Sequence, residues 1–182
     1  MRLCGIDEAG RGPLAGGLTI AGVILSRPIE GLNDSKKLTE KKRETLFVTI
    51  CENSTYHIVR FTPIEIDELG LSACLASGLR EIMTVFGEAD YLYDGNTSFG
   101  VSGIRTMVKA DATIPEVSAA SILAKVSRDR EMIALADRYP QYGFEGNKGY
   151  GSSAHIEAIR RYGYCDIHRK SFKLKALQPT LF

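Results

Sequence analysis

GIDEAGRGP, residues 5–13, is the stretch around which the rest of the chain is organised. The apolar run 1–6 predicts a strand that delivers two adjacent carboxylates, Asp7 and Glu8, into a glycine-rich turn. Inside a strand these side chains would point to opposite faces, but where a strand ends and turns both can lean into one site. Crowded carboxylates hold protons unless a cation lies between them, and Mg²⁺ or Mn²⁺ prefers oxygen ligands. The pair therefore predicts a divalent-metal site, with a solvated acidic turn as the alternative.

The turn that follows has the composition of a ligand-binding loop. Gly10 and Gly12 allow close approach of the backbone to a ligand, or a positive φ. Arg11 between them offers a guanidinium fork suited to phosphate. A phosphate-loop nucleotide binder is one alternative, but no Gly-Lys-[Ser/Thr] follows residues 10–17.

Composition places the chain among ordinary globular proteins. It has 182 residues, of which 44% are hydrophobic and 25% charged, and we expect one domain over residues 1–182. No apolar run approaches the ~20 residues of a membrane span, and no signal-peptide pattern is present. Four scattered cysteines without a Cys-x-x-Cys pair indicate neither zinc nor disulfides. We therefore expect a cytoplasmic monomer, and with a net charge of +1 any nucleic-acid surface must come from local clusters.

The order of predicted elements indicates an α/β fold. Strands over residues 1–6, 17–25 and 56–61 have short links and favour an antiparallel meander, with a helix capped by Thr39 before the third. From residue 56 onward strands and helices alternate, which favours parallel strands. The later elements are a capping box at 62–65, helix 71–86 ending at Gly87, strand 91–93, strand 106–109, helix 116–139 and a helix capped by Ser152 or Ser153. A C-terminal helical part is expected over about 140–175, followed by a tail at 176–182.

Two further carboxylates lie where an α/β active site would place them. Asp94 ends a predicted strand, and Asp111 lies between a short strand and a helix start. Ligands of open α/β sheets gather beyond the strand ends. For either residue alone, a turn aspartate or a helix cap is the alternative.

Six stretches together resemble the motifs of the type 2 ribonucleases H, the ribonuclease HII family, in the order in which that family has them. They are GIDEAGRGPLAG at 5–16, NDSKKL at 33–38, YDGN at 93–96, KADA at 109–112 running into the helix 115–130, KGYGS at 148–152 with His155, and HRKSF at 168–172. The resemblance implies a ribonuclease H-like fold, in which helices flank a five-stranded mixed sheet and a C-terminal helical extension follows.

The resemblance also implies an endonuclease that hydrolyses the RNA strand of RNA–DNA hybrids. It would nick 5′ of ribonucleotides embedded in duplex DNA, as ribonucleotide excision repair and DNA replication require, and leave 3′-hydroxyl and 5′-phosphate ends. Catalysis and the binding of two divalent ions, Mn²⁺ or Mg²⁺, would fall to Asp7, Glu8, Asp94 and Asp111. Two such ions can clamp a scissile phosphate, so no histidine base is required, and His155 is expected to have a structural role or to support residues of the site, with no catalytic role of its own.

Substrate contacts carried over from the family are of three kinds. The backbone of Gly10, Arg11 and Gly12 would read the 2′-hydroxyl, which separates RNA from DNA. Tyr150 would stack on the deoxyribose that follows the ribonucleotide, although a partly buried loop tyrosine is the alternative. The candidates for phosphate contacts are Lys36 and Lys37, together with Lys125 or Arg128.

Two rival assignments keep a nucleic-acid partner. Type 3 ribonucleases H carry an N-terminal hybrid-binding domain and usually a glutamate as the fourth acid. Here the first acid is residue 7 and the fourth is Asp111, so we expect type 2. A catalytically inactive nucleic-acid-binding module is disfavoured, because acidic side chains that face phosphate do not contribute to nucleic-acid affinity.

The last residues suggest a protein partner. QPTLF, residues 178–182, resembles the Gln-x-x-Leu-Phe peptide by which bacterial repair proteins dock on the sliding clamp. Gln178, Leu181 and Phe182 would be the contact residues, and Pro179 would lower the cost of ordering the peptide. A tail packed on its own domain is the alternative.

Overall fold

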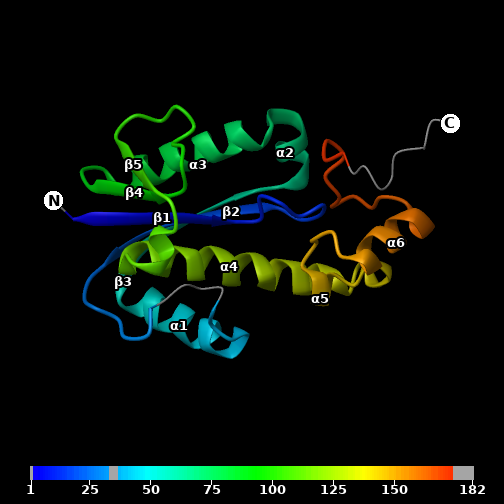
Figure 1. Ribbon diagram of the computed structural model, residues 1–182, viewed down its shortest axis with the longest axis horizontal. Coiled ribbons are helices and arrows are strands. Elements are labelled where there is room, and N and C mark those ends of the chain that lie inside the picture. The colour runs from blue at the N-terminus through cyan, green and yellow to red at the C-terminus, as the bar shows by residue number, and fades with distance from the viewer. Residues whose placement is uncertain (1, 33–36, 174–182) are drawn as a thin grey trace.

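The computed structural model describes residues 2–32 and 37–173 and contains one five-stranded sheet in the order β3-β2-β1-β4-β5 (Figure 1). The strands are β1 (Leu3–Ala9), β2 (Leu18–Leu25), β3 (Ser54–Phe61), β4 (Asp90–Asp94) and β5 (Ile104–Met107). The helices are α1 (Glu40–Glu52), α2 (Pro63–Leu69), α3 (Leu71–Phe86), η2 (Ala110–Ala112), α4 (Pro115–Ala136), η3 (Pro140–Tyr142), α5 (Phe144–Asn147) and α6 (Ser153–Tyr162).

The sheet is mixed, as predicted. Strands β1, β2 and β3 form the antiparallel meander, whereas β4 and β5 run parallel to β1. The register pairs Ile6 with Tyr93. Because β1 and β4 are parallel, the residues that follow this pair, Asp7 and Asp94, leave the same edge of the sheet side by side.

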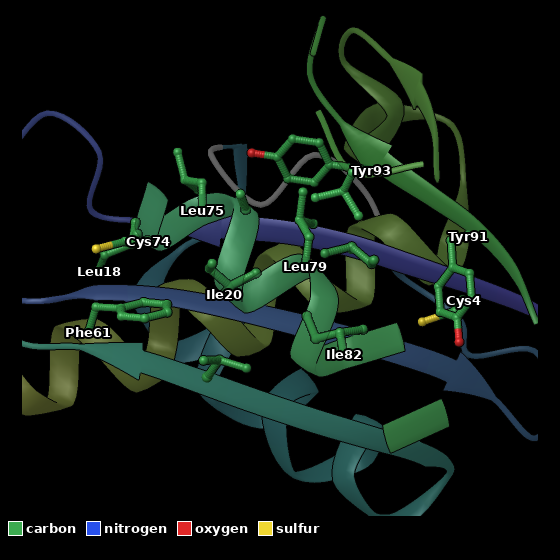
Figure 2. Close-up of a cluster of buried hydrophobic side chains, with 14 of the residues drawn as sticks. Cys4, Leu18, Ile20, Phe61, Cys74, Leu75, Leu79, Ile82, Tyr91 and Tyr93 are labelled. Atoms are coloured by element: carbon green, nitrogen blue, oxygen red, sulfur yellow. The ribbon is translucent and has the colours of Figure 1, made fainter. Parts of the chain in front are cut away.

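The two faces of the sheet carry separate apolar layers. Figure 1 shows α2 and α3 on one side of the sheet and α4, with α1 beyond it, on the other. The α3 layer, seen in Figure 2, includes Cys4 and Ile6 of β1 together with Leu75 and Leu79 of α3. The α4 layer takes Ala9 from β1. Even-numbered residues of β1 therefore face α3 and odd-numbered residues face α4, with the period of two that a strand requires.

The first turn of α4 lies directly against the sheet at Gly5. A Cβ atom placed on Gly5 would lie 2.3 Å from the backbone of Glu116 and Val117 in the first turn of α4. A side chain at this position would push the helix off the strand. Glycine at this position therefore brings the start of α4, and η2 before it, against β1.

Capping chemistry predicted most helix boundaries. Thr62 and Glu65 form the expected capping box, and Gly70, with a φ of 86°, separates α2 from α3. No single helix among the described residues is long and apolar enough to cross a membrane. Only α2 and α3 taken together reach that length and composition, and they meet at 109°. Ser152, not Ser153, caps α6 by accepting a hydrogen bond from the His155 N–H.

Several boundaries differ from prediction. The first strand continues to Ala9, because β2 pairs with it that far. The fifth strand lies at Ile104–Met107, two residues early, because Lys109 turns the chain with a φ of 59°. Helix α4 ends at Ala136, because Tyr139 precedes a proline and leaves the helical region. The C-terminal part is helical only to Tyr162.

The non-helical segment after α6 returns to the start of the chain. Ala15 forms an isolated antiparallel bridge with His168, and the Arg169 N–H donates to the Leu14 carbonyl at 2.8 Å. On its other side, the N–H of Leu14 donates to the Gly149 carbonyl at 2.8 Å. The loop between β1 and β2 is therefore enclosed by two segments that lie more than 130 residues further along the chain.

Candidate active site

Three carboxylates meet at the edge of the sheet where β1 and β4 end. Asp7 and Asp94 are brought together by the parallel register, and Asp111 comes from η2, just before α4. One carboxylate oxygen of each lies within 4.8 Å of the others. Asp94 also accepts a hydrogen bond from the Ala110 N–H at 3.3 Å, which ties the β4 end to the turn that carries Asp111.

Glu8 lies apart from this trio, because β1 is still a strand at this point. Asp7 faces α4, whereas Glu8 faces the α3 layer and accepts a hydrogen bond from the Tyr93 hydroxyl at 2.6 Å. The Arg11 guanidinium lies 3.4 Å from its other oxygen. The expected reason for their proximity, a chain that turns at Asp7 and Glu8, is thus wrong. Both still line one cavity, because the cavity opens across the end of the sheet.

This cavity, of about 480 Å³, gathers most of the predicted residues. Its lining is Asp7, Glu8, Ala9, Gly10, Arg11, Gly12, Asp94, Gly95, Ser121, Lys125 and Tyr150. Asp111 is buried behind it, with 3% of its surface exposed. The cavity thus joins a carboxylate floor to the glycine-rich turn and an aromatic side chain.

The electrostatics of the floor favour a bound cation. Burial raises the pKa of Asp7 well above its usual range, and the charges of Glu8 and Asp94 add to the rise, against a hydrogen bond from Ser121. Burial also raises the pKa of Glu8, against the Tyr93 hydroxyl and Arg11. A positive ion between such groups would remove this penalty.

The trio fits a small divalent ion. Mg²⁺ binds oxygens octahedrally at about 2.1 Å, which places pairs of ligand oxygens roughly 3.0–4.2 Å apart, so oxygens within 4.8 Å of one another can reach one ion by side-chain movements of about 1 Å. Carboxylates are the ligand type that Mg²⁺ and Mn²⁺ prefer. Asp7, Asp94 and Asp111 could therefore hold such an ion together.

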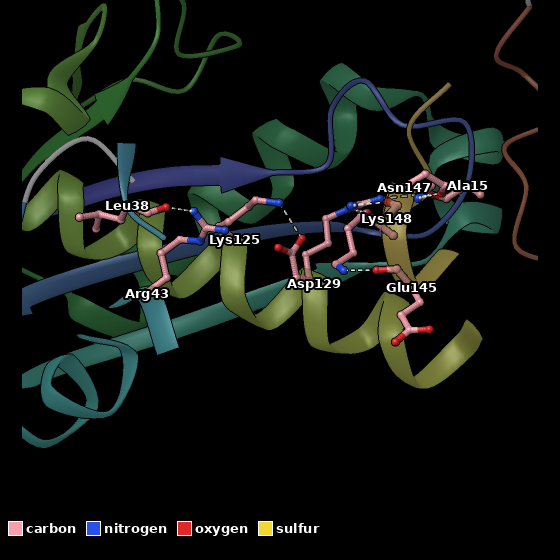
Figure 3. A network of polar contacts seen from close by, with 11 residues as sticks. Ala15, Leu38, Arg43, Lys125, Asp129, Glu145, Asn147 and Lys148 are labelled. Atoms are coloured by element: carbon pink, nitrogen blue, oxygen red, sulfur yellow. Dashed lines mark hydrogen bonds and ion pairs between the residues drawn. The ribbon is translucent and has the colours of Figure 1, made fainter. Parts of the chain in front are cut away.

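Helix α4 forms the wall of the cavity through polar residues at helical spacing. Ser121 and Lys125 line it, and Lys125 pairs with Asp129 one turn later at 2.7 Å (Figure 3). Arg128 does not reach the cavity lining and is only 1% exposed. Its predicted phosphate contact is wrong, because its guanidinium is used by backbone carbonyls within the protein.

The glycine-rich turn presents unused backbone donors. Gly10 has a φ of 100°, which favours glycine, and a Cβ at Gly12 would meet nothing within 4 Å. Among the residues that the structure describes, no acceptor takes the N–H of Gly10, Arg11 or Gly12. All three residues line the cavity, so a ligand with an oxygen acceptor finds free donors there.

Tyr150 is an exposed aromatic residue on a loop whose backbone is hydrogen-bonded to a buried histidine. The residue is 42% exposed and lines the cavity, with the Arg128 guanidinium 5.5 Å from the ring. Its carbonyl accepts a hydrogen bond from His155 Nδ1 at 2.8 Å, and His155 Nε2 lies 3.0 Å from His168 Nε2. His155 is fully buried, which agrees with the structural role expected for it.

The remaining predicted residues lie away from the cavity or outside the described chain. Lys37 is exposed and is not among the lining residues, and Lys36 lies outside the described residues. So do Gln178, Leu181 and Phe182 of the predicted clamp peptide.

Sequence reasoning missed Tyr93, Ser121 and Arg169. Ser121 could have been found from the polar spacing Ser118, Ser121, Lys125 along an otherwise apolar helix. Tyr93 and Arg169 lie in the motif stretches 93–96 and 168–172, but they act through contacts with residues far away in the chain, which those stretches do not identify.

Comparison with known proteins gives a consistent result. The family described as ribonuclease HII matches residues 4–175. A curated ribonuclease HII from Sulfurovum sp. is 62% identical over 181 residues, covering 99% of this chain and 96% of that protein. Two solved structures have the same fold. A PCNA:RNase HII complex from Archaeoglobus fulgidus has a TM-score of 0.81 at 27% identity over 100% of this chain and 98% of that one. Ribonuclease H2 from Pyrococcus horikoshii has a TM-score of 0.75 at 30% identity over 95% and 94%.

Proposed function

The chain belongs to the ribonuclease HII family and is thus a ribonuclease H, and from this premise we propose the finer activity. It is an endonuclease that hydrolyses the RNA strand of RNA–DNA hybrids and nicks duplex DNA 5′ of embedded ribonucleotides. The products carry 3′-hydroxyl and 5′-phosphate ends. One observation carries the proposal: a floor of three carboxylates within 4.8 Å of one another lies beneath a rim of free backbone donors and an exposed tyrosine.

The carboxylates are the proposed catalytic and metal-binding residues. Asp7, Asp94 and Asp111 would hold a divalent cation, Mn²⁺ or Mg²⁺, and Glu8 at the cavity edge would help to hold a second. Divalent ions in such a site lower the pKa of the attacking water and stabilise charge on the phosphate and the leaving oxygen. The buried Tyr93 hydroxyl holds Glu8 by donating to it, which fixes that carboxylate at the cavity wall.

The rim supplies recognition of the substrate. The free N–H groups of the Gly10-Arg11-Gly12 turn donate to the ribose 2′-hydroxyl, the group that DNA lacks. Tyr150 packs on the next sugar, and Lys125 on the cavity wall contacts phosphate, with Lys36 and Lys37 gripping the duplex further out. We propose that the protein works in the cytoplasm as a monomer, in replication and in ribonucleotide excision repair.

A duplex with one embedded ribonucleotide tests this function directly. Incubation with Mg²⁺ or Mn²⁺ is expected to give a single nick on the 5′ side of the ribonucleotide, and EDTA is expected to abolish it. The products are resolved on a denaturing gel, with an all-DNA duplex of the same sequence as the control. Cleavage of the all-DNA duplex, or cleavage that survives EDTA, would refute the proposal.

We further propose that residues 178–182 dock on a bacterial sliding clamp through Gln178, Leu181 and Phe182. The Archaeoglobus fulgidus ribonuclease HII of similar fold was solved in a complex with PCNA, which gives a precedent for such an assembly. A five-residue peptide of this kind supports roughly micromolar affinity, about −8 kcal/mol.

Deleting residues 178–182 is expected to weaken clamp binding at least tenfold and to leave cleavage of free oligonucleotides unchanged. Surface plasmon resonance on an immobilised clamp measures the first, and the nicking assay measures the second. Thr180→Ala is the matched control, because this position is free in the Gln-x-x-Leu-Phe pattern. Unchanged clamp binding by the shortened protein would exclude this contact.

A further inference from the structure

The carbonyl oxygens of the glycine-rich turn converge on one buried guanidinium group. Arg169 donates from Nε to the Gly16 carbonyl at 2.9 Å and from Nη1 to the Arg11 carbonyl at 3.2 Å. Its Nη2 donates to the carbonyls of Gly10 at 2.6 Å and Gly17 at 2.9 Å. A single side chain from the C-terminal segment therefore holds both ends of the loop between β1 and β2.

A second buried guanidinium group extends this arrangement to the tyrosine loop. Arg128 donates from Nε to the Gly17 carbonyl and from Nη2 to the Ala15 carbonyl, each at 3.0 Å. Its Nη1 donates to the Lys148 carbonyl at 2.9 Å, two residues before Tyr150. Figure 3 shows Ala15 and Lys148 close together beside α4.

Both guanidinium groups are shielded from water and are bonded to carbonyl oxygens, not to carboxylates. Each arginine is 1% exposed, and within residues 2–32 and 37–173 neither forms an ion pair. Burial lowers the pKa of Arg169 to about 10, and the neighbouring charge of Arg128 contributes, so Arg169 stays charged at neutral pH. Burying two positive charges without an ion pair is costly, even where carbonyl oxygens accept their hydrogen bonds. This cost is offset if the two arginines are needed to hold the carbonyl groups of the turn in one orientation.

Fixing those carbonyls also fixes the donors of the turn. In a planar trans peptide the C=O of one residue and the N–H of the next point in opposite directions. The Gly10 carbonyl is drawn inward by Arg169, so the Arg11 N–H points away from the guanidinium group. The Arg11 carbonyl orients the Gly12 N–H in the same way. These are donors that no acceptor in the described chain uses, and they belong to residues that line the cavity.

We propose that Arg169 is a positioning residue for ribose recognition, aiming the N–H groups of Arg11 and Gly12 at the 2′-hydroxyl. The inference rests on the proposed function of the turn. Arg128 adds the link to the loop of Tyr150, so that both substrate contacts are set from the same buried pair. Selection of ribonucleotides thus depends on a side chain that never touches the substrate.

Arg169→Lys tests the inference, because lysine keeps the charge but cannot reach four carbonyls with a planar fork. The measurement is the ratio of two dissociation constants, for a duplex with one ribonucleotide and for the same duplex in DNA. Ca²⁺ replaces the catalytic metal so that both substrates stay intact. The variant is expected to lower the preference for the ribonucleotide at least tenfold. Its affinity for the DNA duplex and for Mn²⁺ should match the wild type.

Arg105→Lys is the matched control, because Arg105 is exposed and pairs with Asp90 on the protein surface. If Arg169→Lys fails to fold, Phe172→Leu is tested by the same ratio of dissociation constants. The Phe172 ring lies 5.0 Å from the Arg169 guanidinium and packs against it, so a smaller side chain should loosen the position of the arginine. Here we expect a threefold or greater loss of preference. Either folded variant with the wild-type ratio, or with both affinities reduced equally, overturns the inference. A wild-type protein without any preference would instead refute the proposed function.

Discussion

Asp94→Asn is expected to reduce the rate of RNA cleavage by roughly 10²- to 10⁴-fold, because the loss of one metal-binding charge removes several kcal/mol of transition-state stabilisation. The asparagine oxygen can still accept the Ala110 N–H, so the turn that carries Asp111 should keep its place. The thermal midpoint without metal should not fall, because Asp94 adds to the charge that raises the pKa of Asp7. Single-turnover rates on an RNA–DNA hybrid measure the effect, and calorimetric titration of Mn²⁺ measures the loss of affinity.

Asp90→Asn makes the same chemical change at the other end of the same strand. Asp90 is half-exposed and pairs with Arg105 at 2.7 Å, an interaction worth at most about 1 kcal/mol of stability. Its cleavage rate is expected to stay within about twofold of the wild type. If folded Asp94→Asn cuts within about threefold of the wild type, the carboxylate site is assigned wrongly.

Tyr150→Ala is expected to lower kcat/KM for a duplex with one embedded ribonucleotide by roughly 10- to 70-fold. This corresponds to roughly 1.5–2.5 kcal/mol of lost contact between the ring and the sugar. The carbonyl of residue 150 still accepts the hydrogen bond from His155, so the loop should keep its position. Because Tyr150 is not one of the three clustered carboxylates, the affinity for Mn²⁺ should be unchanged.

Tyr150→Phe separates the ring from the hydroxyl group. It keeps the aromatic face that lines the cavity and is expected to retain cleavage within about threefold of the wild type. Equal cleavage of the junction duplex by the alanine variant and the wild type would remove Tyr150 from the substrate site. Equal losses in both variants would assign the contact to the hydroxyl group instead.

Much of the fold was predictable because its signals are local. The capping box at Thr62, the break at Gly70 and the cap at Thr39 depend on residues within one helical turn. The mixed sheet was predicted from the order of strands and helices, and the structure confirms it. The same order of elements predicted that acids after the strands would meet, since parallel strands bring their ends to one edge of the sheet.

The side chains that the sequence misplaced depend on distant partners. Arg128 was one of two residues of the helix 115–130 that the family resemblance offered for a phosphate contact, but its acceptors are carbonyls from the β1–β2 loop and from Lys148. Glu8 was expected to turn with Asp7, but pairing with β2 keeps β1 extended through Ala9. The positions of both side chains thus depend on backbone groups that only the folded chain brings near them.

The sequence by itself determined the identity of the acids, the glycine-rich turn and the order of the elements, because these depend on local chemistry. Only the tertiary structure decided which acids share one face, which arginines are buried and which N–H groups remain free. A buried charge is stable only where the fold gathers acceptors around it, and those of Arg169 lie more than 150 residues away in the chain. The orientation of the N–H groups at this site therefore depends on the folded backbone as a whole.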